Sequence, residues 1–164
     1  MTPFSAMENH YNLLYREDER ELIPICKQMN VSLMPYSSFA AGHLVRPTRN
    51  SDSLRSKTDR VAMGKYNRME KYDIQIVGRV NELTQKYNCK MSQIAVAWQW
   101  AKGIASPIIG ATKAKYLDDA VGALAVKLTS DDVAYLEEVY VPHPIVGAIN
   151  QNPPQGVTHL DEKK

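Results

Sequence analysis

The sequence has no long hydrophobic run, no strong charge bias and few cysteines, and each absence narrows what the chain can do. No apolar stretch reaches the roughly 18 residues that a membrane-spanning helix needs. A formal net charge of only +2 gives no argument for a nucleic-acid surface. The segment Met1–Phe4 lacks the charged start and apolar core of a secretory signal. We therefore expect a cytoplasmic protein that has neither a membrane nor a nucleic acid as its partner.

Two cysteines are all that the chain has, and its composition is otherwise that of an ordinary globular domain. Cys26 and Cys89 lie far apart and outside any metal-ligand spacing, so reduced thiols are favoured over a disulfide and no metal site is predicted. Hydrophobic residues make up 44% of the chain and charged residues 23%, which suits one domain with a sizeable core. We assign residues 1–147 to that domain and residues 148–164 to an irregular tail.

Short apolar stretches alternate with helical patterns along the chain. Strands are predicted at Phe4–Met7, Val31–Tyr36 and Ser106–Ile109. Caps and apolar spacing predict helices at Glu17–Asn30, Asp73–Asn88, Ser92–Gly103, Lys115–Leu124 and Thr129–Tyr140. Such alternation favours parallel strands joined by helical crossovers, an α/β fold. Three strands are too few for a closed barrel, which needs about eight, so we expect a missing segment upstream.

Local signals give further detail for several of these helices. Asp73 is the expected N-cap of its helix, with Ile74 on the buried face, and Thr129 is the expected N-cap of the last helix, with Asp132 at the capping-box position. Pro24 is expected within the first turn of its helix or at a kink. The tryptophans at positions 98 and 100 are interpreted as packing residues rather than a ligand box.

The segment Val31–Leu44 changes abruptly from apolar to small and hydroxyl-bearing residues. The predicted strand stops at Pro35, and a flat aromatic ring, two hydroxyls and a glycine follow, at Tyr36, Ser37, Ser38 and Gly42. A ring can stack on a ligand, serines and backbone N–H groups can hold an anion, and glycine lets the chain bend closely around it. The alternative is an ordinary turn at a strand end.

Two more segments have the composition of a phosphate site. Gly110, Ala111, Thr112 and Lys113 lie between a predicted strand and a helix N-terminus, where an anion is favoured. The stretch from 45 to 72 has no apolar periodicity and reads as a long polar loop. Its cationic residues could close over phosphates, or the loop could simply be solvated, because acidic residues are interspersed.

Taken together, these segments resemble the C-terminal half of an aldo-keto reductase, from Met7 to Gly147. The stretch M-E-N-H-Y-N-L-L-Y-R-E from Met7 is similar to the family's sixth barrel strand and the residues after it. P-Y-S-S-F-A-A-G from Pro35 is similar to the seventh-strand motif, aromatic-Ser-Pro-Leu-x-x-Gly. Q-I-A-V-A-W from Gln93 and P-I-I-G-A-T-K from Pro107 resemble the approach to the eighth strand and the turn beyond it.

The resemblance implies a partial (β/α)8 TIM barrel, roughly its C-terminal half, and NADPH as the cofactor that reduces a small carbonyl substrate by hydride transfer. Matched by position, the cofactor-binding residues are Glu8, Tyr36, Ser37, Ser38, Phe39, Gly42, Ile109, Gly110, Ala111, Thr112, Lys113, Tyr116 and Asp119. Tyr36 would stack on the nicotinamide, and Ser37 with the backbone of 39–42 would receive the pyrophosphate. Residues 110–113 would surround the adenosine phosphate end, where Lys113 could pair with a 2′-phosphate.

Three positions depart from the family pattern. Glu8 stands where a glutamine usually contacts the nicotinamide carboxamide, and an ionised carboxylate has lost the amide's donor. Ser38 replaces a proline, which restores a backbone donor and is expected to loosen the turn. Tyr116 and Ala120 replace an arginine and an asparagine near the adenosine, which weakens the preference for NADP. We therefore expect cofactor binding that is weak or conditional.

The family's catalytic Asp, Tyr, Lys and His lie on strands of the first half of the barrel, and no segment of this chain resembles them. We assign no catalytic role to His10, Tyr11 or Lys113 because a matching residue type is not a matching position. His10 is interpreted as a structural residue at a strand end. His143 belongs to a C-terminal loop that resembles a substrate-pocket lid or is simply solvated.

Three functions remain open from the sequence. The chain could be the cofactor-binding half of an NADP-dependent carbonyl reductase, inactive until the N-terminal half-barrel joins it. It could instead be an assembly module that pairs its open sheet edges with a second copy of itself. It could also be an expressed remnant without function. We expect the first, with the missing half-barrel or another copy as partner.

Overall fold

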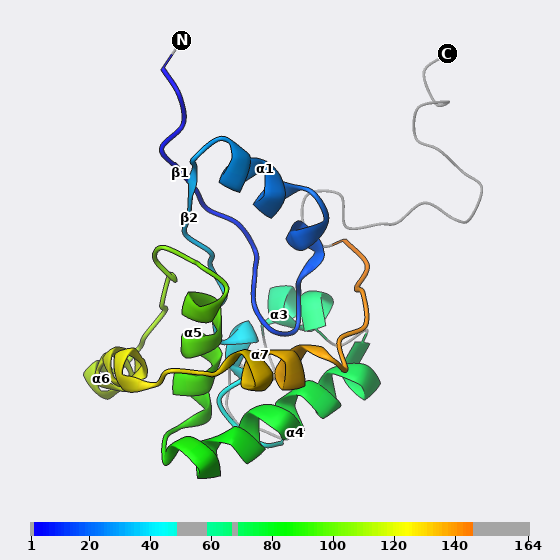
Figure 1. The fold of residues 1–164 in the computed structure, drawn as a ribbon. Coiled ribbons are helices and arrows are strands. Elements are labelled where there is room, and N and C mark those ends of the chain that lie inside the picture. Colours follow the sequence, from blue (N-terminus) through cyan, green and yellow to red (C-terminus); the bar gives the residue numbers. More distant parts are fainter. Residues whose placement is uncertain (1, 49–58, 67–68, 146–164) are drawn as a thin grey trace, which may run out of the picture.

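The computed structural model describes residues 2–48, 59–66 and 69–145, which form a short two-stranded parallel sheet and several helices (Figure 1). The strands are β1 (Ala6–Met7) and β2 (Ser32–Leu33). The α-helices are α1 (Leu22–Gln28), α3 (Arg60–Tyr66), α4 (Glu70–Tyr87), α5 (Met91–Ala101), α6 (Ala114–Gly122) and α7 (Ser130–Glu137). Short 3-10 turns lie at η1 (Glu17–Arg20), η2 (Ala40–Gly42) and η4 (Ala123–Ala125). The predicted tail, 148–164, lies outside the described residues.

The sheet is parallel, as predicted, but its regular strands are much shorter than predicted. Ala6 pairs with Ser32 and Met7 with Leu33. The pairing continues as far as Tyr36, whose N–H donates to Asn9 O at 2.9 Å. Phe4 is 84% exposed, so the prediction of an inner strand beginning there is wrong.

The third predicted strand, Ser106–Ile109, lies beside β2 without forming a regular strand. The N–H of Ser106 donates to Leu33 O at 3.3 Å, and that of Ile108 donates to Pro35 O at 2.8 Å. Pro35 and Pro107 have no N–H to donate, which interrupts the ladder at this point. The prediction of a strand is therefore wrong in detail, although the segment does occupy the place beside β2.

Local sequence signals predicted some features of the helices correctly and others wrongly. Pro24 lies in the first turn of α1, as predicted. Thr129 caps α7 and forms the predicted capping box with Asp132, whose N–H donates to Thr129 Oγ1 at 3.2 Å. Asp73 is not an N-cap, because α4 already begins at Glu70 and buries Asp73 in its first turns. Ile74 is 51% exposed, so its predicted place on the buried face is also wrong.

Helix α3 forms within the stretch that was predicted to be a loop. Its start is fixed by Asp59 Oδ1, which accepts a hydrogen bond from the N–H of Ala62 at 2.9 Å. Residues 49–58, which carry several of the cations predicted to contact phosphates, lie outside the described part of the chain.

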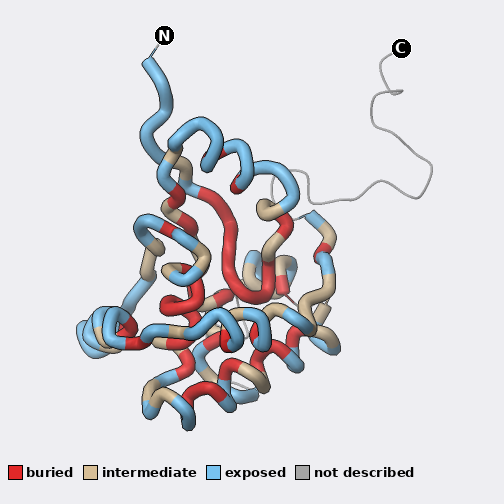
Figure 2. The backbone as a smooth tube through the Cα atoms, in the orientation of Figure 1, coloured by how far each residue is buried: buried red, intermediate tan, exposed pale blue. Residues whose placement is uncertain are grey.

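The core lies between the N-terminal segment after β1 and helices α4, α5 and α7 (Figure 2). Trp98 is fully buried, its ring centroid is 5.1 Å from that of Tyr11, and its Nε1 donates to Glu137 at 2.8 Å. Trp98 is thus a packing residue, as interpreted, and Trp100 is half-buried. Cys26 and Cys89 are free thiols.

His143 joins the end of the described chain to its beginning. Its Nε2 lies 2.9 Å from Asp73 Oδ1, and its backbone N–H donates to Glu17 at 2.8 Å. The side chains of His143 and Asp73 are 2% and 0% exposed. The alternative of a solvated residue is therefore wrong, because His143 is a buried link between α4 and η1, whereas the resemblance of its loop to a lid stays a prediction.

Among the residues described, no helix has the length and hydrophobicity to cross a membrane. The same residues include no group of three or more His, Cys, Asp or Glu side chains that could hold a metal ion.

Candidate functional site

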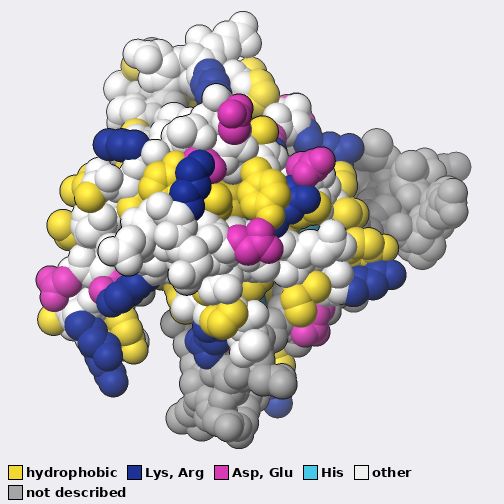
Figure 3. All heavy atoms as spheres, turned by 60° about the horizontal axis from the view of Figure 1, so that its bottom comes forward, with side chains coloured by type: hydrophobic (Ala, Val, Ile, Leu, Met, Phe, Trp, Pro, Cys, Tyr) yellow, Lys and Arg dark blue, Asp and Glu magenta, His cyan; other side chains and the backbone are white. Residues whose placement is uncertain are grey.

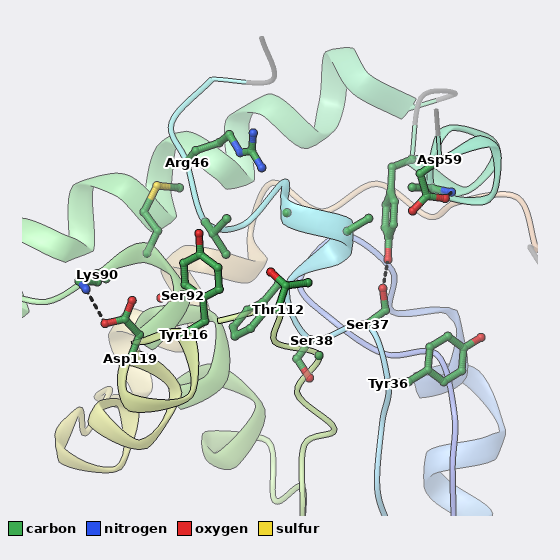
Figure 4. A pocket seen from close by; sticks show the side chains of 18 of the residues that line it. Tyr36, Ser37, Ser38, Arg46, Asp59, Lys90, Ser92, Thr112, Tyr116 and Asp119 are labelled. Atoms are coloured by element: carbon green, nitrogen blue, oxygen red, sulfur yellow. Dashed lines mark hydrogen bonds and ion pairs between the residues drawn. The ribbon is translucent and has the colours of Figure 1, made fainter. Parts of the chain in front are cut away.

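A cavity of about 1050 Å³ lies between the loop after β2, helix α3, the start of α5 and the turn into α6 (Figure 4). Nine of the residues predicted to bind cofactor line it: Tyr36, Ser37, Ser38, Phe39, Gly42, Gly110, Thr112, Tyr116 and Asp119. Four others, Glu8, Ile109, Ala111 and Lys113, are not among its lining residues. The fold thus brings together two segments that are far apart in the sequence.

The loop after β2 is held in a conformation that L-residues seldom adopt. Ser37, Ala40, Ala41 and Gly42 have φ values of +64°, +47°, +54° and +98°. A Cβ on Gly42 would lie 2.9 Å from a guanidinium nitrogen of Arg46, so the glycine lets that cation approach. Such successive backbone turns form concavities that bind anions.

Within the described residues, no acceptor pairs with the N–H of Ser38 or of Phe39. The Ser38 side chain is committed, because its Oγ donates to Ile108 O at 3.1 Å and the residue is buried. The Ser38 hydroxyl thus ties the loop to the segment beside β2, and the expectation that serine loosens the turn stays a prediction.

Tyr66, from α3, fastens the same loop from the other side. Its hydroxyl shares hydrogen bonds with His10 Nε2 at 2.8 Å, Asn12 Nδ2 at 3.0 Å and Ser37 Oγ at 2.9 Å. Asn12 Nδ2 also donates to Ser37 O at 3.0 Å. Burial is the main cause that raises the pKa of Tyr66 to about 12. We call Tyr66, His10, Asn12 and Ser37 the tyrosine hub.

His10 has the structural role that the sequence suggested. It is buried, and burial is the main cause that lowers its pKa to about 3, so its ring stays neutral at physiological pH. Its Nδ1 is buried and has no hydrogen-bond partner in the described part of the chain. Its ring stacks on Tyr15 with centroids 4.3 Å apart.

The Tyr36 ring is already in contact with two other groups. It stacks on His10 at a centroid distance of 5.2 Å and an interplanar angle of 13°. Lys65 Nζ lies 4.7 Å from the ring centroid. Figure 4 shows the ring directed away from Thr112 and Tyr116. A nicotinamide that stacked on Tyr36 would have to compete with these contacts.

The other end of the cavity is built by α5 and α6. Thr112 reaches it from the turn, Tyr116 and Asp119 from α6, and Lys90 and Ser92 from the start of α5 (Figure 4). Lys90 Nζ forms an ion pair with Asp119. The side chains at this end, such as Lys90 and Tyr116, are therefore more exposed than Tyr66 in the tyrosine hub.

The charges of the cavity are mixed. Among the described residues that line it, Arg46, Lys65 and Lys90 are basic and Asp59 and Asp119 are acidic. Figure 3 shows the same interspersion of basic and acidic side chains over one face of the molecule. The described part of the lining thus carries a small excess of positive charge, which favours an anionic ligand.

Sequence reasoning missed the contributions of Tyr66, Lys65 and Lys90. For the first two, the available signal was Asp59, a helix-capping residue type placed just before the residues that form α3. Lys90 has no comparable signal, because its position depends on how α6 packs against α5.

Comparisons with known proteins identify the family. The model of the aldo/keto reductase family matches residues 1–141. The chain is 41% identical over 143 residues to versiconal hemiacetal acetate reductase of Aspergillus parasiticus, covering 87% of this chain and 42% of the relative. It is 40% identical over 147 residues to an aldo-keto reductase of Fusarium vanettenii, covering 89% and 39%.

A solved structure shows the same fold. The glycerol dehydrogenase of Gluconobacter oxydans superposes with a TM-score of 0.69 at 21% identity, over 88% of this chain and 46% of that one. The chain thus spans about two-fifths of the length of the curated relatives that it matches. With the family model matching most of its length, this chain belongs to the aldo/keto reductase family.

Proposed function

We propose that this chain forms the cofactor-binding end of an aldo-keto reductase barrel, corresponding to roughly its C-terminal half, and that it binds NADP(H) in the cavity between α3, α5 and α6. The observation that carries the proposal is the meeting of the loop Tyr36–Gly42 with the turn and helix 110–119 around one cavity of about 1050 Å³. Cofactor and ligand pockets of proteins reach about this size, roughly 300–1,000 Å³.

The residues at the phosphate end suit the cofactor. The N–H groups of Ser38 and Phe39 find no acceptor within the described residues, and Gly42 in the same loop permits the close approach of the Arg46 guanidinium. Donors and a cation around a left-handed loop suit a pyrophosphate. Residues Thr112 and Tyr116 would hold the adenosine end.

The residues at the nicotinamide end fit less well. The Tyr36 ring is occupied by His10 and Lys65, and Glu8 is exposed and outside the cavity lining. NADPH supplies a hydride when it is bound. Fewer residues would orient its nicotinamide here than would hold its phosphates. This uneven fit supports cofactor binding that is weak until another part of the barrel completes the site.

Neither titratable residue of the tyrosine hub is a well-matched proton donor for carbonyl reduction. Tyr66 has a pKa raised to about 12 and its hydroxyl is shared by three hydrogen-bond partners, while His10 has a pKa lowered to about 3. A general acid works best with a pKa near the working pH. We infer that reduction of a small carbonyl compound requires catalytic groups from the rest of the barrel, and that this chain alone does not turn over.

Two exposed apolar stripes support a polypeptide partner. On α1, Leu22, Ile25 and Met29 at its C-terminal cap are 40%, 45% and 66% exposed. On α6, Leu117 and Val121 are 50% and 63% exposed, and Leu124 in the following turn is 55% exposed. Both follow helical spacing, and α1 and α6 lie on different sides of the molecule (Figure 1). Neighbouring helices of a closed barrel would cover such stripes.

A second copy is the alternative partner. Within the described residues β1 pairs only with β2, so its other edge can accept a strand from another chain. Two copies related by a two-fold axis could cover both apolar stripes at once. We expect the protein to act in the cytoplasm, because the free thiols of Cys26 and Cys89 suit a reducing compartment.

Fluorescence titration of the purified chain with NADPH tests the proposal. We expect saturable binding that tightens when the complementary half-barrel is supplied as a second polypeptide, and NADPH oxidation with an aldehyde only in that mixture. No binding by either the chain or the assembled complex would contradict the cofactor site. Turnover by the chain alone would contradict the division of roles. Sedimentation of the chain alone distinguishes a dimer from a monomer.

A further inference from the structure

The end of the cavity between α5 and α6 holds a lysine and a carboxylate that face each other. The Lys90 and Asp119 side chains form an ion pair and are 64% and 23% exposed. Both line the cavity beside Thr112 and Tyr116, and Figure 4 shows the pair next to the Tyr116 ring. The family resemblance gives Lys90 no role.

Helix packing fixes where this pair lies. A Cβ on Gly122 would lie 2.1 Å from Gln93 Nε2, so the end of α6 lies directly against the Gln93 side chain in the first turn of α5. The Gln93 side chain in turn accepts a hydrogen bond from the N–H of Lys90 at 2.8 Å. The backbone of Lys90 at the start of α5 is therefore held in place, and Asp119 reaches the lysine from the neighbouring helix α6.

The two side chains suit different forms of one ligand. A carboxylate accepts hydrogen bonds from ribose hydroxyls, as acidic residues do in proteins that bind NAD. A lysine ammonium pairs with a phosphate as a point charge. NADP differs from NAD only by the 2′-phosphate on the adenosine ribose. If this phosphate bound Lys90, it would have to compete with Asp119 for the lysine and would lie close to the Asp119 carboxylate.

We propose that Lys90 and Asp119 together select between NADP(H) and NAD(H). Lys90 binds the 2′-phosphate, and Asp119 favours the cofactor without that phosphate, both by holding Lys90 and by accepting a hydrogen bond from the ribose. The inference rests on the proposed function, which places the adenosine end of the cofactor at residues 110–119. It gives the chain a modest preference for NADP(H) rather than a strict one.

Lys113 is the competing candidate for the 2′-phosphate. It stands where the resemblance placed that role, but it is exposed at the N-cap of α6 and is not among the residues that line the cavity. The cavity geometry therefore assigns the phosphate to Lys90, and the two lysines make different predictions.

Equilibrium titrations with NADPH and NADH test the inference in the wild-type chain and in K90M, D119N, K113M and K127M. Lys127 is exposed and outside the cavity lining, so K127M removes the same charge elsewhere. We expect K90M to weaken NADPH binding about tenfold with little change for NADH, as the loss of a charge-assisted contact predicts. D119N should tighten NADPH binding by about threefold and weaken NADH binding. Adenosine 2′,5′-bisphosphate and 5′-AMP should show the same pattern.

Each outcome has one meaning. If wild-type chain binds neither dinucleotide, alone or completed by the other half-barrel, the proposed function fails. If it binds NADPH but K90M lowers both affinities equally, or leaves both unchanged, the selector role of Lys90 fails. If K113M alone causes the loss specific to NADPH, the role belongs to Lys113. Circular dichroism checks that each variant is folded, which is expected because an exposed ion pair contributes little to stability.

Discussion

The two ends of the cavity are built in different ways. At one end the tyrosine hub is buried and joined by hydrogen bonds between α3, the segment after β1 and the loop after β2. At the other end Lys90 and Asp119 form an exposed ion pair between α5 and α6. Buried polar groups cost much when they lose a partner, whereas exposed ion pairs cost little. Changes at the hub should therefore affect folding first, and changes at the ion pair should affect ligand choice first.

The largest effect is expected from Tyr66→Phe. Removing the hydroxyl leaves polar atoms of His10, Asn12 and Ser37 buried without this partner, so the free energy of unfolding should fall by about 3 kcal/mol. Urea unfolding followed by circular dichroism measures the loss. The matched control is Tyr116→Phe on α6, where the ring is 40% exposed and the change should stay within about 0.5 kcal/mol. Equal losses of unfolding free energy in Tyr66→Phe and Tyr116→Phe would contradict the expected difference between the two ends of the cavity.

The pH dependence of stability provides the next test of the hub. Burial lowers the pKa of His10 from 6.5 to about 3, so between these values the unfolded chain takes up a proton that the folded chain does not. The stability that the folded chain gains by keeping His10 neutral is fully present above pH 6.5 and is lost as the pH falls toward 3. Linkage gives a slope of up to about 1.4 kcal/mol per pH unit in this window.

His10→Gln should flatten that slope, because glutamine does not titrate. Urea midpoints measured between pH 4 and 7 would show it, with wild-type chain falling more steeply than the variant as the pH decreases. A wild-type stability that did not change over this window would mean that His10 is not held neutral by burial. Measurement at two salt concentrations would reveal how much of the effect comes from Lys65, which also lowers the His10 pKa.

Ser38→Ala is expected to have an intermediate effect. It removes the hydrogen bond from Ser38 Oγ to Ile108 O, which joins the loop after β2 to the neighbouring segment, and should cost about 1 kcal/mol. NADPH affinity should fall as well, because the N–H groups of residues 38 and 39 would be less well oriented. Ser92→Ala, at the other end of the cavity, is the matched control. A loss of affinity without a loss of stability would instead indicate that the Ser38 hydroxyl contacts the ligand.

Features set by neighbouring residues were predictable from the sequence. Thr129 and Asp132 lie within one helical turn, and the capping box between them formed as predicted. The parallel pairing of the first two strands and the place of the 106–109 segment also followed from the alternation of strands and helices. The regular strand at 106–109 did not form, because proline removes donors from both segments there.

Features set by distant partners were not predictable. Asp73 resembles an N-cap, but its side chain is buried against His143, which is 70 positions away. Tyr66 had only the indirect signal of Asp59 at the start of α3, because its partner His10 is 56 positions away. The sequence predicted only those cavity residues that lie in motifs resembling the family. The positions of the cations Lys65 and Lys90 depend instead on helix packing. A residue can therefore be placed from the sequence when its partner lies within one turn.

The smallest change in stability is expected from Gly122→Ala, and it probes the link between helix packing and ligand choice. The new Cβ would lie 2.1 Å from Gln93 Nε2, so the flexible Gln93 side chain must move away from the N–H of Lys90. Because that side chain can rearrange, the loss of stability should stay below about 1 kcal/mol. The ratio of NADH to NADPH dissociation constants should nevertheless change, since Lys90 would no longer be anchored. Gly78→Ala, where a Cβ meets nothing within 4 Å, is the control and should leave the ratio unchanged. An unchanged ratio in Gly122→Ala would show that Lys90 reaches the ligand whether or not Gln93 fixes its backbone.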